Sequence, residues 1–276
     1  MPSGRVQVVA HRGSSGAHPE HTTAAYAAAI AEGADALECD VRLTRDGVLV
    51  CVHDRRVDRT SDGRGVVSTL ELAELAELDF ASWKARDQLE SDGDDDEEAV
   101  DTTDAGQVLT LERLLRLALD HSDRPHPVQL HIEAKHPTRY GGLVERSLVD
   151  LLTRYGLAAP ATREDSRVAV MSFASISLRR IHQLAPALPT VLLMDRVPLR
   201  FRDGTLPPRV HTAGPSLAIL KAHPGYVARL HAAGHRVHVW TVDESADVDH
   251  VLSLGVDAVI SNEPARVLRH LARLRA

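Results

Sequence analysis

Short apolar runs alternate along the chain with segments in which apolar residues recur every three or four positions. Runs rich in Val, Ile and Leu predict buried strands, and the second pattern predicts amphipathic helices. The predicted strands lie near residues 6–10, 36–42, 48–53, 128–134, 168–172, 190–194, 236–242 and 257–261. The predicted helices lie near residues 22–32, 109–120, 141–155, 175–185, 224–233 and 246–254.

This alternation is typical of a parallel α/β architecture. Plausible caps of the predicted helices are Thr22, Thr23, Ser245, Gly33, Gly234 and Gly255. About eight strands with no sign of a second core favour a closed TIM-type (β/α)8 barrel over an open sheet. A length of 276 residues suits one such barrel, so residues 1–276 are predicted to form a single domain.

The connection between the second and third predicted strands is too short for a parallel crossover, which needs a dozen or more residues. Asp46-Gly47 is a strong signal for a tight turn. We therefore predict an antiparallel hairpin, and a turn centred on these two residues places Asp40 opposite His53. A carboxylate and an imidazole would then lie side by side.

Two segments have the composition of loops. Residues 54–108 contain a short predicted helix near 70–78 and the acidic stretch from Glu90 to Glu98. We predict a small insertion here, after the strand that reaches His53. Its acidic part is expected to be a solvated loop, because it lacks the alternating ligand spacing of a calcium loop. Residues 195–215, rich in Pro and Gly, predict a second loop over one end of the barrel.

Composition and charge exclude several classes of protein. The net charge of −7 and pI of about 6.1 argue against a general binder of nucleic acid or anionic membranes. The N-terminus has no signal-peptide pattern, and no apolar run is long enough to span a membrane. In the predicted hairpin register Cys39 and Cys51 lie on opposite faces, which excludes a disulfide between them. We predict a cytoplasmic protein with reduced thiols; its oligomeric state stays open.

Carboxylates interrupt two of the predicted buried strands. Glu38 and Asp40 are two residues apart, so they project from the same face of one strand, and Glu133 lies on another strand. Burying a charge costs several kcal/mol unless it is paired or bound to a metal. Three carboxylates without clustered cysteines predict a site for one hard divalent cation, Mg²⁺, Ca²⁺ or Mn²⁺, rather than zinc. The alternative is that one or two are ion-paired core residues.

His131, Glu133 and Lys135 alternate on one predicted strand and therefore face the same way. Lys135 is one of three lysines among 32 basic residues, which favours a specific need for an ammonium at this position. We interpret Glu133 as a metal ligand and Lys135 as a group that binds a substrate anion, although a buried salt bridge would also fit. His131 is interpreted as a packed, hydrogen-bonded histidine.

His11 and His53 each end an apolar strand, the position where barrel enzymes place their chemistry. Histidine titrates near neutral pH, so the two are candidates for an acid/base pair. Arg12, directly after His11, has a planar fork of donors that can bind a phosphate.

Taken together, these residues resemble the glycerophosphodiester phosphodiesterase family, whose members are metal-dependent enzymes on a TIM-type barrel. The motifs that carry the resemblance follow one another along nearly the whole chain: Ala10-His11-Arg12-Gly13, Pro19-Glu20-His21-Thr22, Leu37-Glu38-Cys39-Asp40-Val41, Thr44-Arg45-Asp46-Gly47, Val52-His53-Asp54, Arg59-Thr60-Ser61-Asp62-Gly63, Ile132-Glu133-Ala134-Lys135, Met171-Ser172-Phe173, Val239-Trp240-Thr241-Val242 and Gly255-Val256-Asp257-Ala258.

The resemblance implies a role for each matching side chain. It implies catalytic acid/base histidines at His11 and His53, and a divalent metal, Mg²⁺ or Ca²⁺, on Glu38, Asp40 and Glu133. It further implies that the phosphodiester binds to Arg12 and Lys135, that Trp240 lines the pocket, and that Glu20 supports the rim. These implied roles are assigned to His11, His53, Glu38, Asp40, Glu133, Arg12, Lys135, Trp240 and Glu20.

Two positions depart from the family pattern. His21 stands where the family usually has Asn, so the role of that side chain is open. The last motif, Ser261-Asn262-Glu263-Pro264, stands where the family usually has Thr-Asp before the proline. We expect this second change to lie outside the catalytic set. The intact catalytic positions argue against an inactive homologue.

The predicted activity is metal-dependent hydrolysis of glycerophosphodiesters to glycerol 3-phosphate and an alcohol, with a small-molecule substrate. A second interpretation is a lysophospholipase D, in which the same residues act on a lipid-tailed diester. Few aromatic residues and no basic amphipathic helix favour a water-soluble substrate. A third interpretation is a barrel that binds sugar phosphates without catalysis.

Overall fold

The computed structural model describes residues 5–85, 106–121, 127–139 and 141–275. Its strands are β1 (Gln7–His11), β2 (Ala36–Leu43), β3 (Leu49–Cys51), β4 (Gln129–Ala134), β5 (Val168–Ser172), β6 (Thr190–Met194), β7 (Thr212–Pro215), β8 (Arg236–Val239) and β9 (Ala258–Ser261). Its helices are α1 (Thr23–Glu32), α2 (Leu72–Ala76), α4 (Leu111–Asp120), α5 (Leu143–Arg154), α6 (Ser175–Leu184), α7 (Leu217–Ala222), α8 (Gly225–Ala232), α9 (Ser245–Leu254) and α10 (Pro264–Arg275). Two short 3₁₀ turns, η1 (Val67–Thr69) and η2 (Leu199–Phe201), complete the elements.

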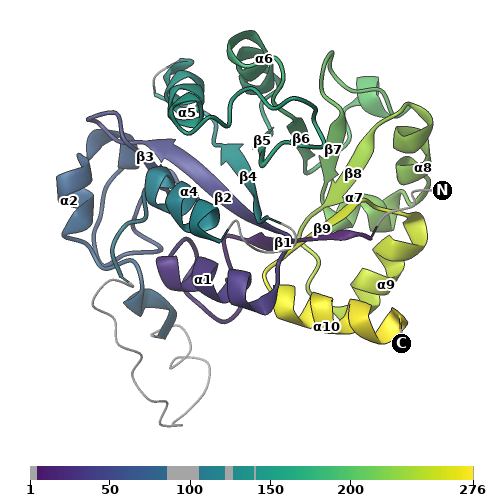
Figure 1. Ribbon diagram of the computed structural model, residues 1–276, viewed down its shortest axis with the longest axis horizontal. Helices are drawn as coiled ribbons and strands as arrows, with labels where there is room; N and C mark the ends of the chain where they lie inside the picture. Colours follow the sequence, from purple (N-terminus) through teal and green to yellow (C-terminus); the bar gives the residue numbers. More distant parts are fainter. Residues whose placement is uncertain (1–4, 86–105, 122–126, 140, 276) are drawn as a thin grey trace.

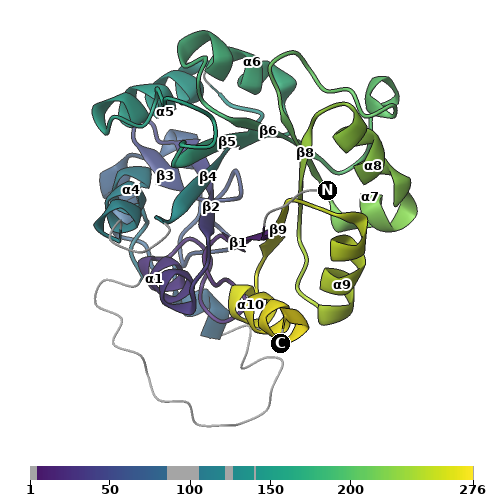
Figure 2. The same ribbon diagram turned by 45° about the vertical axis from the view of Figure 1, so that its right-hand side comes forward.

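In the described part of the chain, eight parallel strands close into a barrel in the order β1-β2-β4-β5-β6-β7-β8-β9, with β9 pairing back to β1. The helices surround the strands (Figures 1 and 2). β3 is antiparallel and pairs with the end of β2, and Val50 forms an isolated bridge to Thr110. The predicted TIM-type barrel is therefore confirmed, with β3 as an addition beside it.

The alternation of side chains along each strand divides the core into an interior and an outer layer. Inside the barrel, Val9, Met171, Leu193 and Ile260 pack against one another. The opposite faces of the strands pack against the buried stripes of the helices. The closed sheet leaves the carboxyl ends of the parallel strands together at one mouth, where inward-facing polar side chains meet.

The helix ends follow local sequence signals. Thr22 is the N-cap of α1, and its side chain accepts a hydrogen bond from the backbone N–H of Ala25. Gly33 ends this helix in the left-handed region, at φ 96°. In α9, by contrast, Glu244 is the N-cap and Ser245, predicted as the cap, is already the first helical residue.

β7, α7 and α10 are elements that the sequence analysis did not predict. The segment Thr212-Ala213-Gly214-Pro215 has no run of large apolar residues, so its pattern indicated part of a loop. It is nevertheless fully buried between β6 and β8. A Cβ on Gly214 would lie 2.7 Å from Leu193 Cδ2, so the glycine allows the neighbouring strand to fill the space. Pairing with both neighbours, rather than side-chain pattern, makes this segment a strand.

The predicted register of the hairpin is wrong by one residue. Val41 pairs with Cys51, and the backbone N–H of Val52, not His53, donates to the carbonyl of Asp40 over 3.0 Å. The cause is a three-residue loop that ends at Gly47 with φ 86°, a common alternative to a two-residue turn. Cys51 therefore shares a face with Cys39 instead of opposing it, and both thiols are free and buried.

Two further points concern the segments outside the barrel. The acidic stretch from Glu90 to Glu98 lies outside the described residues. Within the ranges given above, no helix has both the length and the apolar character that crossing a membrane requires.

Candidate active site

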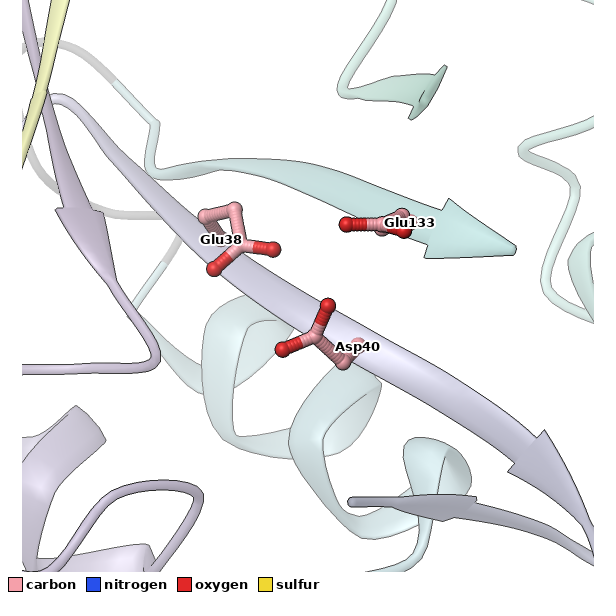
Figure 3. Close-up of side chains that lie close together, drawn as sticks. All are labelled: Glu38, Asp40 and Glu133. Atoms are coloured by element: carbon pink, nitrogen blue, oxygen red, sulfur yellow. The ribbon is translucent and has the colours of Figure 1, made fainter. Parts of the chain in front are cut away.

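Three acidic side chains from two adjacent strands meet at the carboxyl end of the barrel interior. Glu38 and Asp40 lie on β2, and Glu133 on β4 lies directly opposite Asp40 in the parallel register. Each offers an oxygen within 4.8 Å of the others, and the residues are 2%, 1% and 6% exposed. Figure 3 shows the carboxylates directed into the same space. The strand alternation predicted this convergence, and the structure brings the three side chains together.

Two cations lie against this acidic cluster. Arg12 Nε is 3.1 Å from Asp40 Oδ2, and the backbone N–H of Arg12 donates to Glu38 Oε2 over 3.1 Å. Lys135 Nζ is 3.2 Å from Asp40 Oδ1 and 3.1 Å from Glu133 Oε1. Three carboxyls thus face two cations, so one negative charge is left without compensation when all three carboxyls are ionised.

The pKa values of the three carboxyls are shifted in different directions. Burial raises the pKa of Glu38 well above its usual value, and the neighbouring Asp40 raises it further. Burial and Asp40 together raise the pKa of Glu133 to about 8. Burial also disfavours the charge on Asp40, but hydrogen bonding by His21 and the charges of Lys135 and Arg12 hold its pKa well below the usual range.

These carboxyls fit a divalent cation. Arg12 and Lys135 neutralise two of the three carboxylate charges, and oxygen donors without any sulfur are the ligands that Mg²⁺ and Ca²⁺ take. A divalent ion would change the local balance from −1 to +1. That net charge suits a phosphodiester, which carries one negative charge.

His11 ends β1 beside the acidic cluster, with Nε2 4.0 Å from Glu38 Oε2. Its Nδ1 lies 2.7 Å from Asn262 Oδ1. Asn262 Nδ2 donates to Asp243 Oδ2 over 2.8 Å, which fixes the amide with its oxygen towards the histidine. Nδ1 therefore carries the proton, and Nε2 holds a free lone pair. Burial, with the charge of Arg12, lowers the pKa of His11 to about 4, so the ring is neutral at pH 7.

His53 follows β3 and is half-buried. Its Nδ1 is 2.7 Å from Asp54 Oδ1, a carboxylate that stabilises the charged ring. Burial nevertheless lowers the pKa of His53. Arg59 Nε donates to Asp54 Oδ2 over 2.7 Å, and Arg59 also binds Glu20 over 2.7 and 2.9 Å. The insertion thus supplies the groups that orient His53.

Two aromatic side chains form the opposite wall of the mouth. Trp240, after β8, donates its Nε1–H to the carbonyl of Gly214 over 2.7 Å. Phe173, after β5, meets it edge to face with ring centroids 5.4 Å apart, and its ring centroid lies 6.0 Å from Lys135 Nζ. Trp240 therefore lies at the mouth, with Phe173 between it and Lys135.

The chain matches a known protein family over most of its length. Residues 11–266 match the model of the Glycerophosphoryl diester phosphodiesterase family. The chain belongs to this family. Its members are phosphoric diester hydrolases, and the family resemblance found in the sequence is confirmed.

The similarity extends over nearly the full length of several relatives. The chain is 47% identical to a probable glycerophosphodiester phosphodiesterase 1 of Mycobacterium tuberculosis, over 99% of this chain and 95% of the relative. It is 33% identical to a glycerophosphodiester phosphodiesterase of Bacillus subtilis, over 94% and 84% of the two chains. A phosphodiesterase of Oleispira antarctica, solved in complex with the product sn-glycerol-3-phosphate, has the same fold, with a TM-score of 0.78, 24% identity and 96% coverage of both chains.

The two departures from the family pattern both lie in this site. His21 Nε2 is 3.0 Å from Asp40 Oδ2, and Nδ1 is 2.8 Å from the hydroxyl of Tyr26. His21 has φ 61°, a left-handed conformation in which Asn and His are enriched, so the exchange keeps a residue suited to that backbone. The second change lies next to a predicted catalytic residue, because Asn262 contacts His11.

Sequence reasoning also missed two contributions to the site. Lys84, from the insertion, donates to the carbonyls of Ser15, Gly16 and His18, the last two over 2.7 and 3.2 Å. Lys84 therefore holds the loop after His11. No local sequence pattern predicted this role. The second is Asp243, which accepts the hydrogen bond that orients Asn262. It follows a predicted strand, as His11 does, and this position could have indicated a role in the site.

His131 lies deeper in the barrel, outside the cluster. Its ring stacks on that of His238 with centroids 5.3 Å apart. The predicted packing is present, but Nδ1 of His131 makes no hydrogen bond within the described structure.

Proposed function

We propose that this protein hydrolyses glycerophosphodiesters to glycerol 3-phosphate and an alcohol, with one divalent cation and two histidines. The observation that carries the proposal is the buried cluster of Glu38, Asp40 and Glu133 with one uncompensated charge, flanked by His11 and His53. The names of the full-length relatives and the product bound to the Oleispira antarctica protein support the choice of substrate.

The two histidines divide the proton transfers in this proposal. Each holds its Nδ1–H in a hydrogen bond and keeps Nε2 for the reaction. The partner of His11 is a neutral amide, so His11 acts as the base that takes a proton from water as its oxygen bonds to phosphorus. The partner of His53 is a carboxylate, whose hydrogen bond raises the pKa of His53 against the lowering by burial, so His53 is the residue that donates its proton to the departing alcohol oxygen as the phosphorus–oxygen bond breaks.

The phosphoryl group binds through the cations of the cluster. Arg12 offers a planar fork of donors and Lys135 a point charge, and both suit non-bridging phosphate oxygens. A bound divalent cation would add neutralisation of the charge that gathers on those oxygens in the transition state. Mg²⁺ and Ca²⁺ both fit the oxygen donors, and the cytoplasmic location stays a prediction from the sequence.

A lysophospholipase D activity is the second candidate. Apolar side chains are exposed on the segments that follow β4, β5 and β6: Leu143, Phe173 and Ile176 are 40%, 43% and 37% exposed, and Leu199 is 79% exposed. These segments border the mouth of the barrel, where an acyl chain attached to the glycerol would leave the site. The reaction residues would be the same.

The test is turnover of a panel of glycerophosphodiesters and lysolipids, with glycerol 3-phosphate and lysophosphatidic acid measured separately. Protein treated with EDTA should be inactive, and Mg²⁺ or Ca²⁺ should restore activity. Glu133→Gln should raise the metal concentration needed for half activity at least about tenfold, because it removes a ligand charge. Glu112→Gln, on the exposed face of α4, is the matched control and should not change it.

Three results separate the candidates. Release of lysophosphatidic acid alone would favour the lipid substrate. Binding of glycerol 3-phosphate without turnover of any diester, whichever metal is added, would leave only a sugar-phosphate-binding barrel. Full activity in EDTA would contradict the metal requirement.

A further inference from the structure

A second cavity opens beside the acidic cluster, and Lys135 lines it. Its volume is about 320 Å³. The walls come from the end of β2, from Arg55 and Val66 of the insertion, from η1, and from residues 137–139 after β4. Since the ammonium of Lys135 contacts Asp40 and Glu133, the cavity begins where the phosphoryl group would lie.

The charge of this cavity has one sign. Its lining includes Arg42, Arg55, Lys135 and Arg139, and among the described residues it includes no acidic side chain. The cavity on the other side of the mouth, next to His11, has mixed charge. Its charged lining residues are Arg12, Lys84, Arg266, Glu20, Asp243, Glu244 and Glu263.

Carboxylates outside the cavity compensate part of its positive charge: Lys135 contacts Asp40 and Glu133, and the charges of Asp40, Glu133 and Asp54 act on Arg42. Arg42 donates to the backbone carbonyl of His53 from Nε and Nη2 over 3.0 and 2.7 Å. A carbonyl fixes the guanidinium without cancelling its charge. Burial lowers the pKa of Arg42, the charges of Asp40, Glu133 and Asp54 raise it, and the like charge of Arg55 lowers it. An anion between the two arginines would relieve that repulsion.

We propose that this cavity is the subsite for the alcohol group of the phosphodiester, and that it selects alcohols that carry a phosphate or carboxylate. The proposal rests on the proposed function. A phosphodiester has two arms, and its glycerol arm is uncharged. The four cations that line the cavity can therefore distinguish substrates only by the charge of the alcohol group.

The experiment compares three glycerophosphodiesters that share the glycerol arm. These are glycerophosphocholine, with a cationic alcohol, glycerophosphoglycerol, with a neutral one, and the phosphate monoester of glycerophosphoglycerol. Loss of the diester is followed by phosphorus NMR with saturating metal. We expect kcat/KM to rise from the first substrate to the third, by about tenfold or more for the added phosphate, since a charge-assisted hydrogen bond contributes about 1.5–3 kcal/mol. This preference should shrink as NaCl is raised, because exposed charges are screened.

Arg55 is the residue to change, because it is exposed and its replacement leaves the fold intact. Arg55→Gln should lower kcat/KM about three- to tenfold for the phosphate-bearing substrate and less than twofold for glycerophosphocholine. Arg55→Glu should lower it further. The matched control is Arg56→Gln: Arg56 binds Asp58 and does not line the cavity.

The failure of this inference differs from the failure of the proposed function. Hydrolysis of none of the three substrates, with any metal, would overturn the proposed function and the subsite with it. Hydrolysis of all three at similar kcat/KM, or equal losses in Arg55→Gln for charged and uncharged alcohols, would overturn the subsite alone.

Discussion

The two ends of the barrel interior carry polar side chains from the same strands, but these side chains lie in opposite electrostatic settings. β4 contributes to both: Glu133 and Lys135 face the carboxyl end, and His131 faces inward nearer the amino end. At the carboxyl end, three carboxyls lie against two cations, and the net negative charge of the ionised groups suits a metal ion. At the amino end, His131 and His238 stack on each other, and no carboxylate of the described residues acts on either ring.

The difference shows how burial acts on groups with and without partners. Burial lowers the pKa of His131 to about 4 and that of His238 well below its usual value, so both rings are neutral at pH 7. Asp40 is buried as deeply but stays charged, because Arg12 and Lys135 contact it. A buried polar group keeps its charge only where the fold provides the opposite one.

The largest expected difference between the two ends comes from replacing a histidine at each of them. His11→Ala and His53→Ala should each lower kcat about 10²–10⁴-fold, the usual contribution of general acid–base catalysis. His238→Phe, which keeps a ring in the stack, should leave kcat within about twofold, because the amino end takes no part in the reaction. Circular dichroism checks folding. Near-normal kcat in folded His11→Ala would end its assignment as the base.

A smaller effect should come from the residue that orients His11. Asn262→Ala removes the acceptor of the Nδ1–H, so the ring can turn and place its proton on Nε2. We expect kcat to fall about fivefold, with KM nearly unchanged, since one hydrogen bond contributes about 1 kcal/mol.

The readout that separates orientation from loss of structure is the pH profile of kcat. Asn262→Asp restores an acceptor and should recover most of the activity, with the alkaline shift that a charged partner of His11 causes. An Asn262→Ala protein with wild-type kcat would show that the tautomer is not fixed by this contact.

Much of the fold was readable because short apolar runs rich in Val, Ile and Leu mark buried strands. β7 was not readable, since Thr212 to Pro215 become a strand only through pairing on both sides. The hairpin was predicted as a hairpin, but its register depends on whether the loop has two or three residues. That choice is set by the backbone of Gly47 and not by the strands.

The cluster of Glu38, Asp40 and Glu133 was predictable because strand alternation alone fixes which side chains face inward. The groups that support the histidines were harder to predict. Asn262 contacts His11 across 251 positions of sequence, and Lys84 reaches the loop after His11 from the insertion. Such contacts arise from closure of the barrel, so no local pattern reports them.

The smallest expected effect concerns stability at the amino end. The unfolded chain binds a proton on each histidine near pH 6.5, whereas buried His238 binds one only at much lower pH. The unfolded state therefore binds more protons as the pH falls below about 6.5, and stability is lost in that range.

Urea unfolding of the metal-saturated protein at pH 7, 6 and 5 measures this loss. The loss in His238→Phe should be smaller than in the wild type by up to about 1.4 kcal/mol per pH unit, because the substituted ring cannot bind a proton. His223→Gln is the control: this histidine is exposed, so folding does not remove it from water, and the slope should match the wild type. Equal slopes in wild type and His238→Phe would mean that the stacked imidazoles are already protonated in the native barrel. The neutral character of its amino end would then be lost, and with it the contrast to the charged carboxyl end.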